Sequence, residues 1–288
     1  MSSTSLHIVI AGAGPAAQAL VRRLAGRTDN RQQPFAGTIT VLSNRDDCPD
    51  ALLELAELPQ VSVRFGQAAS FIDADSKVVT TVDGMEFTYD QLVIATGSAP
   101  ALPPADGADS VLSYSTIDDA AFIGEAVKDV TRSVGRRPLG ILVGNGPAAG
   151  QAEAVLRARG IRPVRTTLRP TAVVAADSAG SGQAQSAAGI VFEDGSSMKG
   201  DLVVLAEERT ARNDLAESAG LEIAFDGGIA VGRDLATSVP GIWAIGDAAS
   251  CDGLRLGLLL SAESSAMLCA SGMLLGSAGS GIQTAMAA

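Results

Sequence analysis

Two short runs of small residues could hold the phosphates of a dinucleotide. The first, Gly12-Ala13-Gly14-Pro15-Ala16-Ala17, follows the apolar run Ile8–Ala11 and precedes a helical pattern. In a G-x-G-x-x-A turn the first glycine permits a tight turn and the second lets the backbone approach a pyrophosphate. The small last residue lets the helix pack against the strand. The sequence therefore predicts a pyrophosphate at the amino end of a helix that begins near Pro15.

The same pattern occurs a second time. The run Gly144-Asn145-Gly146-Pro147-Ala148-Ala149 differs from the first only at its second position, and it again follows an apolar run, Gly140–Val143. A repeat with an apolar strand before it and a helical pattern after it indicates two dinucleotide-binding folds in tandem.

The segments around the first run must form strands and a helix for this prediction to hold. A helical pattern spans about residues 15–25, and the β-branched run Thr38–Leu42 suits a parallel strand, so we expect a βαβ unit. The second strand of such a unit often ends in an acid that binds the adenosine ribose. Here it ends in Ser43 and Asn44, whose hydroxyl and amide can bind a ribose without the strength of a carboxylate.

Composition narrows the class of protein. The chain has 288 residues, of which 47% are hydrophobic, enough for two modest domains. Its net charge of -11 argues against a nucleic-acid-binding surface. Glycine, serine or glutamate interrupts its apolar segments, so we expect neither a signal peptide nor a membrane span. Three cysteines without a C-x-x-C pair fit a reducing, cytoplasmic location, and a single histidine argues against a metal centre.

Further motifs complete a family pattern. Tyr89-Asp90 and Ala95-Thr96-Gly97-Ser98 lie between the two glycine-rich runs, and Val239-Pro240-Gly241-Ile242-Trp243-Ala244-Ile245-Gly246-Asp247-Ala248 lies near the end. With these motifs the chain resembles the FAD- and NAD(P)-dependent pyridine nucleotide-disulfide oxidoreductase superfamily. The resemblance implies an α/β fold of two tandem Rossmann-like domains, the second inserted in the first and shortened. It implies an FAD-binding domain at 1–108 and 228–288 and a reduced NAD(P)-binding-like domain at 109–227. The C-terminal interface domain of larger relatives is expected to be lacking, and the oligomeric state stays open.

The resemblance also assigns residues to cofactors. It implies that FAD is held by Gly12, Gly14, Pro15, Ala16, Ala17, Ser43, Asn44, Thr96, Gly97, Gly246 and Asp247. A carboxylate at Asp247 suits the ribityl hydroxyls, and a helix that begins after it would add backbone N–H donors. NAD(P)H, as a possible second cofactor, would lie at Gly144, Gly146, Ala149 and Arg169.

The inserted domain departs from the family pattern. Glu207 and Glu208 follow the apolar strand near 201–206, where relatives have a small Ala-Thr-Gly turn. A carboxylate facing a pyrophosphate would cost about 1 kcal/mol or more. Glu207 is also a candidate for acid–base catalysis, with a solvated turn as the alternative. The strand near 161–167 ends without an acid, and Arg165 and Arg169 could meet a 2′-phosphate or be solvated.

The cysteines do not form the pair that disulfide reductases use. Cys48 lies near the position of the single redox cysteine of some relatives and is a candidate for catalysis, whereas Cys251 and Cys269 fit structural thiols. We therefore expect an enzyme that moves electrons from NAD(P)H through FAD to a non-disulfide acceptor, either a small molecule or a redox partner. Two alternatives stay open. One is a flavoprotein that has lost nicotinamide binding and acts on a biosynthetic substrate, and the other is a non-catalytic descendant with a binding or assembly role.

Overall fold

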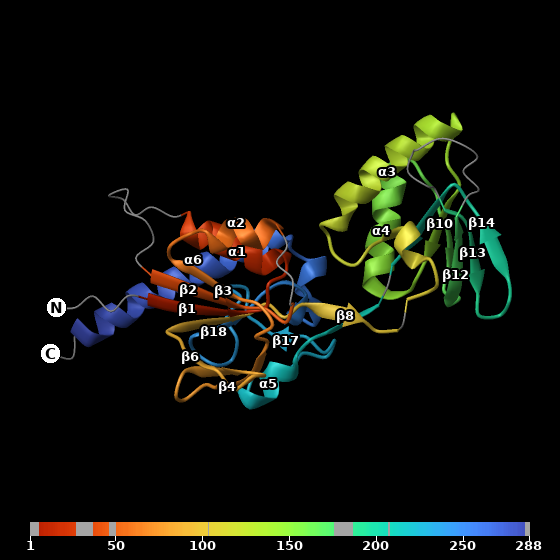
Figure 1. Cartoon of the computed structure of the whole chain (residues 1–288). Coiled ribbons are helices and arrows are strands. Elements are labelled where there is room, and N and C mark those ends of the chain that lie inside the picture. Colours follow the sequence, from red (N-terminus) through yellow and green to blue (C-terminus); the bar gives the residue numbers. More distant parts are fainter. Residues whose placement is uncertain are drawn as a thin grey trace. The chain divides into compact units, whose positions relative to one another are not determined.

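The computed structural model describes residues 6–26, 37–45, 50–102, 104–175, 187–206 and 208–285. The chain divides into two compact units (Figure 1). The first unit comprises Met1–Ser98 and Ala211–Ala288, and the second comprises Ala99–Thr210. The sequence placed the divisions after residues 108 and 227, whereas the compact units divide after Ser98 and Thr210.

A five-stranded parallel sheet forms the centre of the first unit, in the order β18-β7-β1-β2-β3. Four of its strands come from the beginning of the chain: β1 Leu6–Ala11, β2 Gly37–Leu42, β3 Val61–Arg64 and β7 Gln91–Ile94. The fifth, β18 Ile242–Ala244, comes from the far end of the sequence. Most residues of the central strands β1, β2 and β7 are buried, in keeping with their apolar, β-branched sequences.

Helices cover one face of this sheet, and a small antiparallel sheet lies on the other (Figure 1). The helices are α1 Pro15–Ala25, α2 Asp50–Ala56 and α6 Ala262–Ala285. The opposite face carries β4 Ala69–Asp73, β5 Val78–Thr81 and β6 Glu86–Thr88, together with α5 Asp214–Ser218. The alternating segments 71–73 and 77–81 and the Asp83-Gly84 turn residues are typical of a β-hairpin, and β4, β5 and β6 form there.

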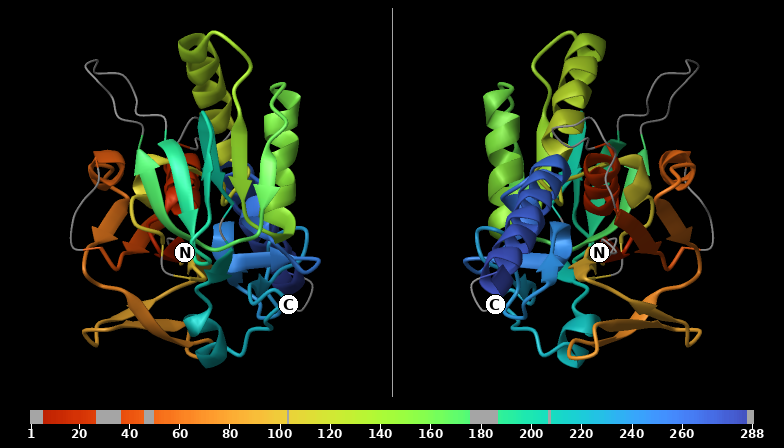
Figure 2. Two further views of the ribbon diagram at one scale, coloured as in Figure 1. Left: turned by 90° about the vertical axis from the view of Figure 1, so that its right-hand side faces the viewer. Right: turned by 90° about the vertical axis from the view of Figure 1, so that its left-hand side faces the viewer.

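Helix α6 packs against α1 although nearly the whole chain separates the two helices (Figure 2). It also lies close to Trp243, since a Cβ on Gly272 would be 2.7 Å from the Trp243 ring. The Trp243 indole donates a hydrogen bond to the Gln91 side chain at 2.7 Å, which satisfies its polar atom in the core. These contacts join the last segment of the chain to the sheet that its first segment forms.

The segment between β18 and α6 corrects one expectation. The sequence predicted a helix directly after Asp247, but only the 3-10 turn Gly246–Ala248 forms there. The chain then makes the short strands β19 Ala249–Cys251 and β20 Leu254–Arg255, which pair with each other, and β17 Ile229–Ala230 pairs with β19. A second 3-10 turn, Leu256–Leu258, precedes α6. The backbone after Asp247 therefore pairs with neighbouring strands and does not form a helix.

The second unit repeats the parallel arrangement on a smaller scale. Its four-stranded parallel sheet has the order β11-β10-β15-β9, with β9 Leu112–Ser113, β10 Gly140–Val143, β11 Val164–Thr166 and β15 Leu202–Leu205. Helices α3 Asp119–Val134 and α4 Gly146–Ala158 contact each other beside it. Strand β11 has only three residues, in keeping with Pro163 directly before it.

An antiparallel sheet completes the second unit. It consists of β12 Pro170–Ala175, β13 Ala187–Phe192 and β14 Ser197–Lys199, and the turn residues Asp194-Gly195 lie between β13 and β14. A short 3-10 turn, Ala108–Ser110, contacts β12. Side chains from both sheets share one apolar cluster: Ile141, Val143, Ile190, Phe192, Val203 and Leu205. The strands on which the chain leaves and re-enters the first unit, β8 Ser98–Pro100 and β16 Arg209–Ala211, pair with each other.

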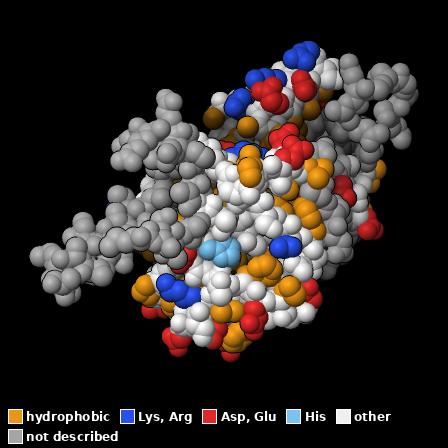
Figure 3. Space-filling model, turned by 60° about the vertical axis from the view of Figure 1, so that its left-hand side comes forward, with side chains coloured by type: hydrophobic (Ala, Val, Ile, Leu, Met, Phe, Trp, Pro, Cys, Tyr) orange, Lys and Arg blue, Asp and Glu red, His pale blue; other side chains and the backbone are white. Residues whose placement is uncertain are grey.

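Two observations relate to the membrane span and the nucleic-acid-binding surface that the composition argues against. None of the helices in the described ranges combines the length and the apolar character that a bilayer crossing requires. On the face of the molecule in Figure 3, acidic and basic side chains are interspersed among uncharged ones.

Candidate functional site

The first glycine-rich turn, residues 12–17, begins at the carboxyl end of β1, between its neighbours β2 and β7. The Gly12 N–H donates to the Leu42 carbonyl at 2.8 Å, and the Ala95 N–H donates to the Ala11 carbonyl at 2.8 Å. Gly12 has a φ of 117°, and a Cβ there would lie 2.1 Å from the Ala95 carbonyl oxygen. Only glycine fits this position. The turn therefore lies where the strand order reverses, the place at which open α/β sheets bind ligands.

Helix α1 presents an open amino end. Its N-cap is Gly14, and among the described residues no side chain caps it. The first turn reads Pro15-Ala16-Ala17-Gln18, and no described atom lies within 4 Å of the place that a Cβ on Gly14 would take. Ala17 is 1% exposed and lets the helix approach the sheet. Uncapped N–H groups, the positive end of the helix dipole and open space beside Gly14 fit a pyrophosphate.

The Gly246–Asp247 turn lies against this helix end. A Cβ on Gly246, whose φ is 63°, would be 3.0 Å from the Ala16 side chain. The Ile245 N–H donates to the Ile94 carbonyl at 3.0 Å, which holds the turn at the carboxyl end of β7. Residues that are far apart in the sequence are therefore adjacent at the amino end of α1.

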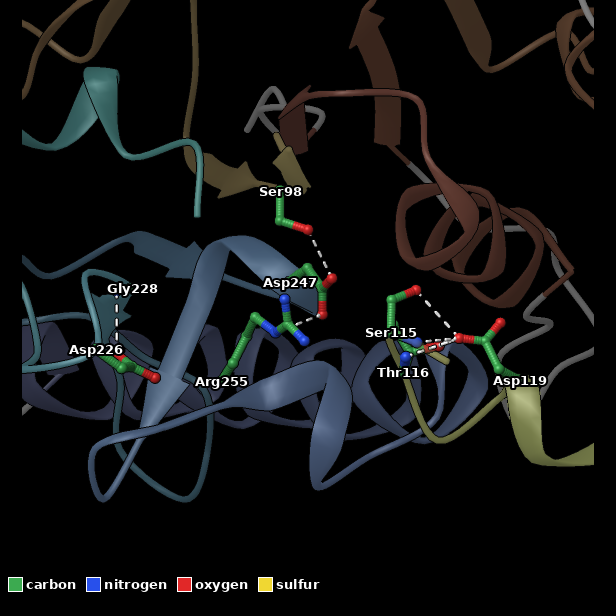
Figure 4. A network of polar contacts seen from close by, with 8 residues as sticks. All are labelled: Ser98, Ser115, Thr116, Asp119, Asp226, Gly228, Asp247 and Arg255. Carbon is green, nitrogen blue, oxygen red and sulfur yellow. Dashed lines mark hydrogen bonds and ion pairs between the residues drawn. The ribbon is translucent and has the colours of Figure 1, made fainter. Parts of the chain in front are cut away.

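Asp247 belongs to a partly buried polar group with Ser98 and Arg255 (Figure 4). The Ser98 hydroxyl donates to Asp247 Oδ2 at 2.7 Å, and Arg255 Nε lies 3.5 Å from Asp247 Oδ1. The side chains of Arg255 and Asp247 are 9% and 11% exposed. The carboxylate is thus balanced by a cation, and any cofactor hydroxyl would share it with Ser98.

Sequence reasoning missed the partners of Asp247. The signal for Arg255 was present, because an arginine inside the apolar run 254–260 must find a counter-charge if that run is buried. Ser98 directly follows the Ala95-Thr96-Gly97 motif, but no local pattern pairs it with a residue near the end of the chain.

Thr96 and Gly97 bind the return segment of the chain. The Thr96 hydroxyl donates to the Arg212 carbonyl at 2.6 Å, and the Arg212 N–H donates to the Gly97 carbonyl at 2.9 Å. Gly97 has a φ of 72°, which favours glycine. Both residues thus help to hold the segment with which the chain returns to the first unit.

The end of β2 shows which predicted ribose ligand is accessible. Ser43 is buried, and its hydroxyl accepts a hydrogen bond from the Arg45 N–H at 3.1 Å. Asn44 is exposed. Of the two, Asn44 has the side chain that a ribose could reach from solvent.

The second glycine-rich turn, residues 144–149, repeats the geometry of the first. The Gly144 N–H donates to the Thr166 carbonyl at 3.0 Å, the Ala206 N–H donates to the Val143 carbonyl at 2.8 Å, and a Cβ on Gly144 would lie 2.3 Å from the Ala206 carbonyl oxygen. Ala149, in the first turn of α4, is fully buried. The repeat predicted from sequence is therefore a repeat of hydrogen bonds and close contacts.

Two charged side chains distinguish the second turn. Glu208 Oε1 lies 3.6 Å from the place that a Cβ on Gly146 would take. Arg165 Nε donates to the Gly144 carbonyl at 3.3 Å, and its Nη1 lies 3.3 Å from Glu153 Oε2 on α4. Arg169 is exposed after β11, and Glu207 lies outside the described residues. A pyrophosphate would fit this turn less well than the first, because a carboxylate already borders it.

The described cysteines show no redox pair. Cys251 and Cys269 are free thiols, and burial raises the pKa of Cys269 well above its usual range. Such a thiol does not ionise readily and is a poor nucleophile. Cys48 lies outside the described residues. In the described part of the chain no group of three or more potential metal ligands is found.

Two parallel-sheet units, each with a glycine-rich turn at a helix amino end, define a protein with two dinucleotide-binding folds. The pyridine nucleotide-disulphide oxidoreductase family model matches residues 6–151 and 145–270. The chain belongs to this family, whose members use FAD and NAD(P)H.

Relatives in the family include subunits of larger enzymes. The assimilatory nitrate reductase electron transfer subunit of Bacillus subtilis (strain 168) is 32% identical over 218 residues, which cover 69% of this chain and 28% of the relative. The nitrite reductase (NADH) large subunit of Escherichia coli (strain K12) is 29% identical over 227 residues, which cover 69% and 26%. This chain thus matches about a quarter of the length of these relatives.

The nitric oxide reductase FlRd-NAD(+) reductase of Aeromonas salmonicida (strain A449) is 28% identical over 90% of this chain and 74% of the relative. Among solved structures, HlmI matches with a TM-score of 0.57 at 16% identity, over 99% of this chain and 98% of that one. A covalent putidaredoxin reductase–putidaredoxin complex matches with a TM-score of 0.52 at 20% identity, over 92% and 75%. These structural likenesses support the fold.

Proposed function

We propose that this chain is a flavin-dependent oxidoreductase that holds FAD in its first unit, takes electrons from NAD(P)H at its second unit and passes them to an acceptor other than a disulfide. One observation carries the proposal most directly. The open amino end of α1 and the Gly246–Asp247 turn are adjacent, since a Cβ on Gly246 would lie 3.0 Å from the Ala16 side chain. A phosphate-binding helix end beside a carboxylate suits a ligand with both a pyrophosphate and a polyol.

The residues of the first unit have distinct roles in this proposal. The uncapped N–H groups of α1 bind the pyrophosphate, while Gly14 leaves room for it and Gly12 fixes the turn. Asp247, held by Ser98 and Arg255, accepts hydrogen bonds from cofactor hydroxyls. When bound, the flavin ring supplies the capacity to accept a hydride and to release electrons in one or two steps. The protein supplies orientation and a low-dielectric environment.

The acceptor is argued from cysteine chemistry and from relatives. The two cysteines in the described part of the chain are free, and Cys269 is buried, so the thiol relay of a disulfide reductase lacks its parts there. The B. subtilis relative is named an electron transfer subunit, and a putidaredoxin reductase is among the structural likenesses. A redox partner protein or domain is the acceptor these names favour, with a small molecule as the alternative that a partner-free assay would identify.

The first test is the cofactor content of the full chain. Purified protein is expected to be yellow, to release FAD on denaturation and to bleach when NADH or NADPH is added without oxygen. A yellow protein that neither nucleotide bleaches would favour the flavoprotein without nicotinamide chemistry, for which Glu208 beside Gly146 is the specific observation. Protein that stays colourless and takes up no FAD would contradict the proposal.

A substitution at Gly14 separates cofactor binding from folding. Its φ of -72° suits any residue, and no described atom would contact a new Cβ. We expect Gly14→Ala to fold with a stability within about 1 kcal/mol of wild type, because the lower flexibility of the unfolded chain opposes the weakness of alanine as an N-cap. FAD binding should weaken, roughly tenfold or more, because the methyl group occupies space that the phosphate needs. Unaltered FAD affinity in Gly14→Ala would contradict the proposal that the pyrophosphate lies beside Gly14.

A further inference from the structure

The turn after β7 in the first unit differs from the turn after β15 in the second unit in a way that bears on nucleotide binding. Ala95 and Ala206 have the same role, because the carbonyl oxygen of each closes the space beside Gly12 or Gly144. Two residues after Ala95 the chain has Gly97, and two residues after Ala206 it has Glu208. A glycine in one unit therefore corresponds to a carboxylate side chain in the other.

The Glu208 carboxylate reaches the amino end of α4. Its Oε1 lies 3.6 Å from the place that a Cβ on Gly146, the first residue of α4, would take. The corresponding space beside Gly14 in the first unit is open, with no described atom within 4 Å. The positive end of the helix dipole stabilises an anion at this point, so the carboxylate is held where a pyrophosphate would otherwise lie.

Neighbouring groups hold the Glu208 backbone near the turn, and a cation at this turn, Arg165, is already paired with an acid. The Ala101 N–H donates to the Glu208 carbonyl at 2.9 Å, so the backbone is fixed and only side-chain rotation can remove the carboxylate. Arg165, a cation at the same turn, contacts the Gly144 carbonyl and pairs with Glu153. Glu153 also pairs with Arg157 at 2.6 Å. The charge of Arg165 is therefore shared with an acid before any phosphate arrives.

We propose that Glu208 sets a low affinity of the second unit for the pyrophosphate of a nicotinamide dinucleotide, which must displace the Glu208 carboxylate to bind. This inference rests on the proposed function, because it concerns the site of the electron donor. Repulsion between charges about 4–6 Å apart at a partly solvated site weakens binding roughly tenfold. Glu208 is then a specificity-determining residue that favours ligands without a phosphate at this turn.

Binding of NAD⁺ measures this effect without turnover, because the oxidised nucleotide does not reduce the flavin. Titration calorimetry on the FAD-loaded full chain would compare wild type with Glu208→Gln, which removes the charge and keeps the size, and with Glu208→Ala, which removes both. We expect both variants to bind NAD⁺ about tenfold more tightly than wild type. The gain should shrink at high salt, since the effect is electrostatic. Adenosine, which has no phosphate, should bind all three proteins equally.

Two controls keep the result interpretable. Glu222→Gln removes one exposed acid from the first unit and should leave NAD⁺ binding unchanged. Unaltered FAD affinity in the Glu208 variants reports that the first unit is intact. NAD⁺ affinity that does not rise in either Glu208 variant would overturn the inference. The proposed function fails separately if NAD⁺ affinity rises as expected but neither NADH nor NADPH reduces the flavin.

Discussion

The two glycine-rich turns show how one backbone device can be kept while its ligand site changes. Gly12 and Gly144 make the same hydrogen bond to the neighbouring strand, and a carbonyl oxygen crowds each from the other side. The device locks a strand to a helix and stabilises the fold whether or not a ligand binds. The residues two positions beyond the crowding alanine, Gly97 and Glu208, are free of that constraint. The difference indicates that the ligand preference of each unit is set by this turn and less by the shared glycines.

The aspartates directly before β7 and β15 extend the repeat. Asp90 accepts a hydrogen bond from the His7 N–H at 2.7 Å, and its own N–H donates to the His7 carbonyl. Asp201 makes the same pair of bonds with Leu139, at 2.7 and 2.8 Å. Only Asp201 adds a two-pronged ion pair with the Arg136 guanidinium. The units thus share this pair of hydrogen bonds and differ in the charged side chains beside it.

The largest expected effect comes from breaking the shared lock. A Cβ at residue 12 would overlap the Ala95 carbonyl at 2.1 Å, and φ there is 117°, so Gly12→Ala should destabilise the first unit by roughly 2–5 kcal/mol and abolish FAD binding. Gly144→Ala should destabilise the second unit by a similar amount and leave FAD bound. Thermal unfolding with FAD fluorescence measures both. Equal loss of FAD in the two variants would show that the locks do not act unit by unit.

The next effect tests the charge pair of the first unit. Replacing Arg255 with Met leaves the Asp247 carboxylate without its counter-charge, at an expected cost of about 3 kcal/mol in the free energy of unfolding. Ser98→Ala, which removes one hydrogen bond, should cost only about 1 kcal/mol. In the double variant Asp247→Leu/Arg255→Met the cost should be smaller than for Arg255→Met alone, since both charges are gone. Urea unfolding of the apoprotein measures these free energies. A double variant less stable than Arg255→Met would argue against an ion pair.

A smaller effect should appear as a pH dependence of the second unit. Burial raises the pKa of Asp201, but the hydrogen bond from the Leu139 N–H and the Arg136 guanidinium outweigh it, so the pKa lies below its usual range. Because the folded pKa is lower than the unfolded one, the stabilisation is present above the unfolded pKa and is lost as pH falls through the folded pKa. Asp201→Asn should therefore cost about 1–2 kcal/mol near pH 7 and little in acid. If Asp201→Asn lowers the free energy of unfolding by the same amount from about pH 7 to pH 3, this assignment is contradicted.

The smallest effect is expected at the cysteines. If electrons leave the flavin without a thiol relay, Cys48→Ala and Cys251→Ala should each keep the rate of NAD(P)H-dependent acceptor reduction within about twofold of wild type. Cys269, whose pKa burial raises, should resist alkylation in the native protein. Loss of most activity in Cys48→Ala would restore a thiol step and overturn the non-disulfide assignment.

The two glycine-rich turns, the strands and helices beside them, and the family could all be predicted from the amino-acid sequence. These depend on local rules: a glycine is needed where φ is positive, a small residue where a helix meets a sheet, and an apolar run where a strand is buried. The antiparallel strands β4, β5, β13 and β14 also carry local signals, because their sequences alternate or are joined by turn residues.

The contacts between residues that are distant in the sequence could not be predicted in this way, because they depend on how the whole chain packs. The Gly246–Asp247 turn against α1, the Arg255–Asp247 pair and the approach of Glu208 to Gly146 all join segments that no local pattern relates. The helix expected after Asp247 was wrong for the same reason, since β19 pairs there with β17 and β20 instead. Electrostatics depends on distances in space, and these follow from packing of the whole chain. The shared glycine locks could therefore be predicted from sequence, whereas the charges that distinguish the two units could be placed only in three dimensions.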